Sequence, residues 1–203
     1  MTLHALRTLP AVIVAAAAMT AVPTAQTPPL ALDTARVTIA GSSNIHEYTA
    51  STATVRVTRV KVAVPVTGEA FWDDIVKPGA LEGFEVAIPA ATLTSPKAGL
   101  DKNMHKALKV EANPDITFRL ARLERAATGA LTAVGTLRIA GVEREVVLAL
   151  KTERRDAALV VRGQLALVMT DYGITPPKAL MGMLKTDPKV TVTFETVLAI
   201  SQT

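Results

Sequence analysis

Histidines are the side chains of this sequence best suited to catalysis or metal binding, and there are only three: His4, His46 and His105. Cysteine is absent, which excludes disulfides, thiol nucleophiles and thiolate metal sites. A zinc site would have to add carboxylates such as Glu47 or Asp101, and no recognised spacing of ligand pairs is present. A Gly-x-Ser-x-Gly turn and a glycine-rich phosphate loop are also missing. We therefore expect neither an enzyme nor a protein-bound metal or cofactor.

Polar side chains in three separate segments are candidates for contacting the head group of a bound amphiphile: His46, Asn103, His105 and Tyr172. Histidines on strands or short helices are more often structural hydrogen-bonding groups, so both interpretations stay open for the two histidines. Lysines form a second set that could offset the charge of a pyrophosphate, although lysines on a helix face are most often simply solvated. These lysines are Lys102, Lys106, Lys109, Lys178 and Lys185.

Apolar side chains that could line a binding cavity are found in the same segments and one further connection: Trp72, Met104, Leu108, Phe118 and Met169. The apolar phases of the expected strands are aliphatic, and aromatic residues make up only 3% of the chain. Smooth aliphatic walls suit a flexible prenyl or acyl chain. Methionine fits a tunnel wall and a gap in a core equally well. The alternative is therefore a barrel filled by its own side chains.

The segment that would position several of these residues spans residues 100–120. Apolar residues at four-residue spacing predict a short amphipathic helix over about residues 98–110. The Asn113-Pro114 pair should break this helix, because proline cannot continue it and favours extended geometry in the residue before it. Alternation at period two then predicts a strand at residues 116–120. We expect the helix and a loop at residues 171–177 to flank the mouth of the cavity.

Most of the remaining chain alternates apolar and polar residues, as half-buried strands do. A change of phase at Arg59 and Val60 predicts a β-bulge, and Ala140-Gly141 predicts a hairpin turn. Residues 178–184 could form one or two helical turns. Besides the strand at residues 116–120, strands are expected at residues 36–40, 42–51, 54–66, 85–89, 129–140, 142–151, 159–169 and 190–200.

These patterns predict an all-β domain of about eight antiparallel strands with one short helical insertion. Closing the sheet into a barrel is the simplest way to remove its exposed edges. A barrel of this size can hold a small ligand or be filled by its own side chains. A sandwich of two sheets is the structural alternative.

The N-terminus has the layout of a secretory signal peptide, with basic residues, a short apolar run and small residues. We expect a signal peptide at residues 1–25, a leader at residues 26–34 and one domain at residues 35–203. The apolar run is too short to span a bilayer comfortably, so export to the periplasm or beyond with cleavage is the expected outcome. A net charge of only +4 and few aromatic residues make a nucleic-acid partner improbable.

Several short motifs, in order and spacing over nearly the whole expected domain, resemble the YceI-like family of bacterial, mostly periplasmic proteins. More typical members have an aspartate-histidine-serine segment at the first strand, whereas this chain has Ala40-Gly41-Ser42-Ser43, as in a variant branch. The motifs that carry the resemblance are Ser43-Asn44-Ile45-His46-Glu47, Asp101-Lys102-Asn103-Met104, Ala107-Leu108-Lys109, Pro114-Asp115-Ile116-Thr117-Phe118, Gly135-Thr136-Leu137, Gly141-Val142 and Thr170-Asp171-Tyr172-Gly173-Ile174.

The resemblance implies a lipocalin-like extended antiparallel β-barrel. Its interior would hold a long apolar amphiphile such as a polyisoprenoid, an isoprenoid quinone or a fatty amide. The expected function is thus an exported lipid-binding protein that sequesters or carries this ligand.

A rival hypothesis is a filled barrel that docks a membrane redox partner, and a metal-dependent enzyme is a more distant one. The sequence leaves homodimer formation open.

Overall fold

The computed structural model describes residues 29–66, 70–179 and 183–201. The expected signal peptide and residues 26–28 of the expected leader lie outside these ranges. The first strand begins within the expected leader, five residues before residue 35. In chain order the elements are β1 (Leu30–Ser43), β2 (Glu47–Thr52), β3 (Arg56–Val62), α1 (Phe71–Asp74), β4 (Leu81–Pro89), η1 (Ala90–Thr92), α2 (Ala98–Leu108), β5 (Asp115–Arg125), β6 (Leu131–Ile139), β7 (Val142–Arg155), β8 (Ala158–Val168), η2 (Met169–Tyr172), β9 (Lys178–Ala179) and β10 (Leu184–Ile200).

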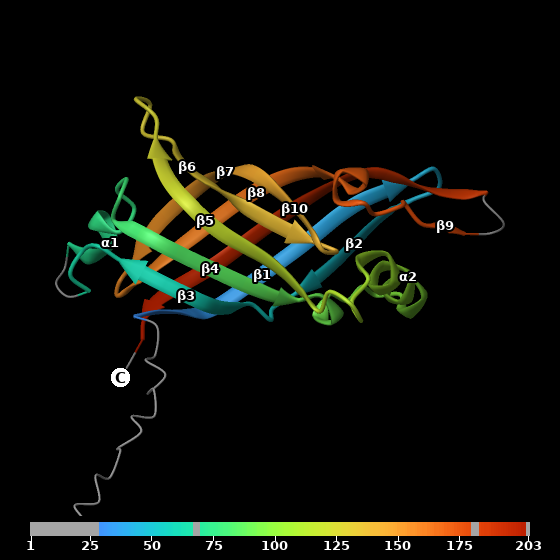
Figure 1. The fold of residues 1–203 in the computed structure, drawn as a ribbon, viewed down its shortest axis with the longest axis horizontal. Coiled ribbons are helices and arrows are strands. Elements are labelled where there is room, and N and C mark those ends of the chain that lie inside the picture. The colour runs from blue at the N-terminus through green and yellow to red at the C-terminus, as the bar shows by residue number, and fades with distance from the viewer. Residues whose placement is uncertain (1–28, 67–69, 180–182, 202–203) are drawn as a thin grey trace, which may run out of the picture.

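All the strands belong to one antiparallel sheet, which curls into an elongated barrel (Figure 1). The strand order is β2-β1-β10-β8-β7-β6-β5-β4-β3, with β9 paired to β10 alone. The long strands β1 and β10 pair with each other along most of their length, from the Leu30 and Ile200 pair onward. The predicted all-β barrel is confirmed, and the two-sheet sandwich is excluded because a single sheet contains all the strands of the described residues.

Two local features of the sheet, a change of register and a hairpin turn, lie at or next to the positions that the sequence predicted. The register between β3 and β4 shifts between Val57 and Arg59, next to the predicted bulge. At the predicted hairpin turn, Ala140 and Gly141 both have positive φ, of 50° and 87°, between the Ile139 and Val142 pair. Turns of this kind match the twist of the flanking strands and favour glycine.

The helical insertion α2 follows the predicted periodicity, but it ends at Leu108, several residues before Pro114. Lys109 adopts the left-handed conformation at φ 54°, and its backbone N–H donates to Lys106. The N–H of Val110 reaches back to the carbonyl of His105, which closes the last turn of the helix. A left-handed cap, usually glycine or asparagine, therefore ends α2 before the proline can.

Two predicted connections differ in the structure. The connection that was expected to hold Trp72, between the predicted strands at residues 54–66 and 85–89, contains the short helix α1. Residues 178–184, expected to be helical, instead supply strand β9 and the first residue of β10, with residues 180–182 outside the described ranges. The helical prediction was wrong for Lys178 and Ala179, because pairing with β10 outweighs their local preference.

Buried apolar side chains form three clusters along the length of the barrel. One lies beneath α2 and η2 and includes Leu108, Ile116 and Tyr172. A middle cluster includes Leu120 and Leu148, contributed by β5 and β7. The third packs around α1 at the other end of the barrel, with Leu30, Phe71, Trp72, Ile75 and Leu159 buried in it.

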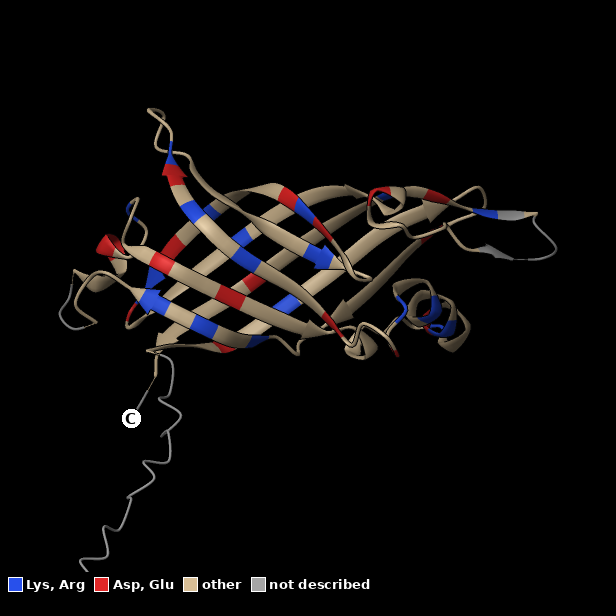
Figure 2. Ribbon diagram, in the orientation of Figure 1, with Lys and Arg blue, Asp and Glu red and all other residues tan. Residues whose placement is uncertain are grey.

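The outer wall of the barrel carries charges of both signs in neighbouring positions (Figure 2). Glu153 is the centre of one network, in which Arg155 and Arg162 both donate to its carboxylate. Hydrogen bonds from Arg155 and then Arg162 lower the pKa of Glu153 to about 2. Because these groups lie on the solvated outer wall, we ascribe no large stabilisation to them.

Candidate ligand-binding cavity

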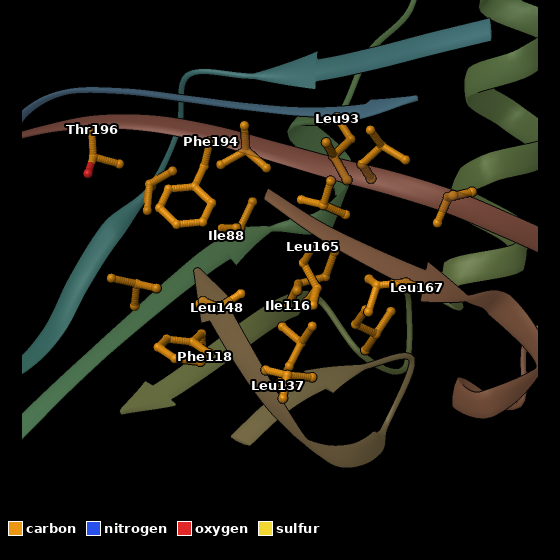
Figure 3. Close-up of a pocket in the computed structure, with 18 of the residues that line it drawn as sticks. Ile88, Leu93, Ile116, Phe118, Leu137, Leu148, Leu165, Leu167, Phe194 and Thr196 are labelled. Atoms are coloured by element: carbon orange, nitrogen blue, oxygen red, sulfur yellow. The ribbon is translucent and has the colours of Figure 1, made fainter. Parts of the chain in front are cut away.

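An apolar cavity of about 470 Å³ runs through the interior of the barrel. Inward-facing aliphatic side chains from β1, from β4 to β8 and from β10 form its wall (Figure 3). No lysine, arginine, aspartate or glutamate of the described residues lines it. A cavity of this size is within the range that small-molecule sites occupy. Labelled wall residues in Figure 3 are Ile88, Leu93, Ile116, Phe118, Leu137, Leu148, Leu165, Leu167, Phe194 and Thr196.

Polar lining residues gather mainly at the α2 end of the cavity. Two of them, His46 and Asn103, are exposed to solvent, which identifies this end as the mouth. Thr152 and Thr196 are polar exceptions near the other end, where the cluster around α1 packs over the interior. The polar residues at the mouth are Ser43, His46, Tyr48, Asn103, Tyr172 and Thr186.

Hydrogen bonds fix the turn between β1 and β2 at this mouth. The hydroxyl of Ser43 accepts from the backbone N–H of His46 at 3.1 Å and donates to its carbonyl at 2.9 Å. The side chain of Asn44 donates to the carbonyl of Met183 at 2.9 Å and accepts from the N–H of Lys185 at 2.8 Å. The mouth is therefore built from two hairpins that are tied together although they are far apart in the sequence.

Tyr48 lies across this rim, with its ring over Gly41 on the neighbouring strand. Burial raises the pKa of the Tyr48 phenol above its usual 10.0, and the nearby Asp187 carboxylate raises it further. A neutral phenol can donate a hydrogen bond to a carbonyl or ether oxygen. The mouth thus offers donors and acceptors without fixed charge.

Four of the five residues predicted for the apolar wall do line the cavity: Met104, Leu108, Phe118 and Met169. Trp72 does not line it. Its side chain is only 4% exposed and packs edge to face on Phe71, with ring centroids 4.9 Å apart, in the cluster around α1. The prediction for Trp72 is corrected because the short helix α1 turns the indole into the core beside the cavity.

Of the residues predicted for the head group, His46, Asn103 and Tyr172 border the cavity. His105 does not, because its Nε2 lies 2.8 Å from the carbonyl oxygen of Leu93. That contact ties α2 to the segment after η1, so His105 has the structural role that was the alternative interpretation. Tyr172 is 3% exposed. Burial raises the pKa of its phenol, the Asp171 carboxylate raises it further, and Arg144 opposes the shift.

Much of the wall and part of the rim were missed by sequence reasoning. The aliphatic wall residues were expected to face inward, but nothing in the sequence distinguishes a cavity wall from a packed core. Tyr48 and Thr186 come from hairpins that are joined only in space, so no local pattern marks them. Ser43 could have been predicted, because a serine hydroxyl at the start of a turn often accepts hydrogen bonds from backbone N–H groups of the turn.

The predicted lysines are on the outside of the mouth rather than in it. Lys102, Lys106 and Lys109 are exposed on α2, as is Lys185 on β10. The side chain of Lys178 lies outside the described residues. Within the described ranges, no group of three or more histidine, aspartate or glutamate side chains is placed to hold a metal ion. No helix among these residues has the length and apolar character needed to cross a membrane.

The fold and the cavity together define a class, that of small antiparallel β-barrels with an elongated apolar interior open at one end. A family model described as "YceI-like domain" matches residues 31–198. The chain therefore belongs to the YceI-like family, as the sequence motifs indicated.

Solved structures show the same fold at low sequence identity. BcnA of Burkholderia cenocepacia is 13% identical with a TM-score of 0.63, over 81% of this chain and 96% of that one. A polyisoprenoid binding domain from Saccharophagus degradans, implicated in plant cell wall breakdown, is 13% identical with a TM-score of 0.63, over 86% and 100%. The Campylobacter jejuni YCEI protein is 15% identical with a TM-score of 0.51, over 74% and 85%. No curated protein sequence matches the chain.

Proposed function

We propose that this protein binds a long apolar amphiphile in the barrel, with the tail in the cavity and the head group at the mouth beside α2. The observation that carries the proposal is an interior wall without charged side chains, whose polar residues gather mainly at one end. Each methylene moved from water into such a wall contributes about 0.8 kcal/mol, so a long tail can offset the cost of its own ordering.

The candidate ligands are polyisoprenoids, isoprenoid quinones and fatty amides. Membership of the YceI-like family supports them, and the Saccharophagus degradans relative is itself a polyisoprenoid binding domain. The rim favours an uncharged head group, because Tyr48, His46 and Asn103 can exchange hydrogen bonds with a carbonyl, hydroxyl or amide. A pyrophosphate would have to stay outside the cavity, near the exposed lysines of α2.

Export is part of this proposal. The basic and apolar character of residues 1–25 supports a signal peptide, and proteins of this family are mostly periplasmic. In that setting the protein would sequester or carry a lipid that water alone does not dissolve, and it would not act as a catalyst.

A filled barrel that docks a membrane redox partner was the rival hypothesis. A cavity of about 470 Å³ gives the filled barrel no support. We have no observation that favours a redox partner, and none that favours a homodimer.

The test is native mass spectrometry of protein purified without detergent from the periplasm of its own host, followed by solvent extraction. We expect a defined prenyl or acyl species at near one-to-one stoichiometry. A ligand-free mass, together with failure to take up added prenyl or acyl lipids, would contradict the proposed function.

A further inference from the structure

Two large apolar side chains project into solvent from two hairpins that are hydrogen-bonded to each other at the mouth of the barrel. Ile45, in the turn between β1 and β2, is 60% exposed, and Met183, in the hairpin between β9 and β10, is 69% exposed. Asn44, the neighbour of Ile45, holds the carbonyl of Met183 at 2.9 Å. We call Ile45 and Met183 the apolar tip.

The pairing of these residues is unusual for this surface. Only four large hydrophobic side chains of the described residues are exposed, and the other two, Val147 and Ile200, lie apart on β7 and at the end of β10. Single exposed hydrophobic residues are normal on a soluble protein. Two of them on hydrogen-bonded hairpins beside the opening of an apolar cavity expose apolar surface on the path that a lipid must take.

Hydrogen bonds make the apolar tip a defined structure. The Ser43 hydroxyl accepts from the N–H groups of Ile45 and His46, at 3.3 and 3.1 Å. Asn44 bridges to the other hairpin through three hydrogen bonds, two from its side chain and one from its backbone N–H to the carbonyl of Lys185 at 3.1 Å. Several polar contacts therefore fix the two hairpins that present these apolar side chains to solvent.

Basic side chains lie at the same end of the barrel. From Lys97 to Lys109 the sequence has four lysines and one carboxylate, that of Asp101, which accepts from the N–H of Ser95. All four lysines are exposed, and Figure 2 shows basic positions in blue on α2. Met104 of the same helix lines the cavity. The lysines concerned are Lys97, Lys102, Lys106 and Lys109.

These lysines differ from the paired basic residues of the barrel wall. Ion pairs on the wall, such as Lys61 with Glu82 and Arg162 with Glu195, neutralise arginine and lysine side chains along it. None of the lysines from Lys97 to Lys109 forms an ion pair with another described residue. The positive field is local to α2, because carboxylates occur elsewhere at this end of the barrel. They are Glu47, Glu111, Asp171 and Asp187.

We propose that this end of the barrel docks on the surface of a lipid bilayer that contains anionic lipid. Ile45 and Met183 enter the boundary between head groups and acyl chains, and the lysines of α2 contact the phosphates. Shallow apolar insertion combined with basic side chains is the usual basis of reversible attachment to a membrane surface. Docking sets the mouth against the bilayer, so an apolar ligand passes between membrane and cavity without crossing water. The role of this docking surface in lipid transfer rests on the proposed function, whereas binding to the bilayer does not.

The experiment is flotation of the purified protein with vesicles of phosphatidylcholine, with and without phosphatidylglycerol. We expect binding to the mixed vesicles that weakens as salt is raised, because the lysine contacts are screened. The double substitution of Ile45→Ser with Met183→Ser should weaken binding by about tenfold or more, and Lys102→Glu with Lys106→Glu should do the same. The matched controls on the wall, Val147→Ser and Lys151→Glu, should leave it unchanged.

A second measurement tests insertion directly. In an Ile45→Trp variant, the new indole should be quenched by brominated acyl chains in the same vesicles, whereas the native Trp72 is buried at the opposite end of the barrel. Absence of binding to the mixed vesicles would overturn the proposal. Equal losses of vesicle binding in the wall controls, or undiminished binding in both the tip and the lysine variants, would also overturn it. The same holds if the protein never binds vesicles but binds a partner protein through these residues.

Loading of the cavity is measured separately, with a prenol delivered from cyclodextrin in the absence of vesicles. The tip and lysine variants should still load. In the unsubstituted protein, failure to bind vesicles with loading intact would refute only the docking surface, and failure to load with vesicle binding intact would refute only the proposed function.

Discussion

Phe194 on β10 lies directly opposite Gly163 on β8, and its ring occupies the space that a side chain on Gly163 would need. The same arrangement recurs where the ring of Phe118 covers Gly135, within 2.6 Å of the position of an added Cβ. Both rings line the cavity. Because the glycines lack side chains, the rings can lie back against the wall and leave the interior open.

We predict that Gly163→Ala reduces lipid loading more than it reduces stability. The added methyl group must push the Phe194 ring inward, and overpacking of this kind costs about 1–3 kcal/mol. Uptake of a cyclodextrin-delivered prenol and thermal unfolding measure the two effects. The matched rescue is Gly163→Ala with Phe194→Leu, which removes the ring and should restore uptake. If Gly163→Ala loads as well as the unsubstituted protein, the glycine does not keep the cavity open.

The two histidines of the described chain should respond differently to alanine substitution. His105→Ala removes the contact of Nε2 with the Leu93 carbonyl and leaves a partly buried acceptor unpaired, which should cost about 1 kcal/mol in the free energy of unfolding. It should also speed ligand exchange, because α2 loses an attachment beside the mouth. His46 is exposed and its ring has no hydrogen bond within the described residues, so His46→Ala should leave stability unchanged. Denaturant unfolding distinguishes the two variants, and equal stabilities would contradict these roles.

Titration of the two tyrosines, the only ones in the chain, should show both phenols ionising above the usual pKa of 10.0. Since the folded pKa values are raised, the stabilisation from the neutral phenols is complete below pH 10 and is lost as the pH rises through those values. Ultraviolet absorbance of the phenolate follows ionisation, and Tyr48→Phe assigns the remaining step to Tyr172. A bound head group that accepts from Tyr48 should raise its pKa further. An unshifted midpoint for Tyr48 in the folded protein would refute its burial at the rim.

Sequence reasoning predicted the features that depend on local pattern. The apolar spacing of α2, the hairpin at Ala140-Gly141 and the alternation of the strands each follow from a few neighbouring residues. The end of α2 did not follow, because Lys109 adopts a left-handed conformation that glycine or asparagine usually provides. Helix α1 has only four residues, too few to give a periodicity, and so the burial of Trp72 could not be predicted.

The candidate site was predicted only in part, for a related reason. Met104 and Leu108 lie on a periodic helix face, so their inward orientation could be inferred. The rim depends on the pairing of Asn44 with Lys185, which are 141 residues apart, and no sequence pattern marks that contact. Likewise, the inward phase of a strand shows which side chains are apolar, but not whether opposite walls meet or leave a cavity.

The central claim is that a lipid tail occupies the inside of the barrel, and two adjacent residues of β7 test it most directly. Leu148 faces the cavity at 9% exposure, whereas Val147 faces solvent at 56%. The measurement is the amount of prenyl or acyl lipid extracted per folded protein from Leu148→Trp and Val147→Trp, with circular dichroism to confirm folding. We predict that Leu148→Trp, which fills the cavity, loses most of its lipid, and that Val147→Trp keeps the full amount. Equal lipid in two folded variants would contradict binding inside the barrel.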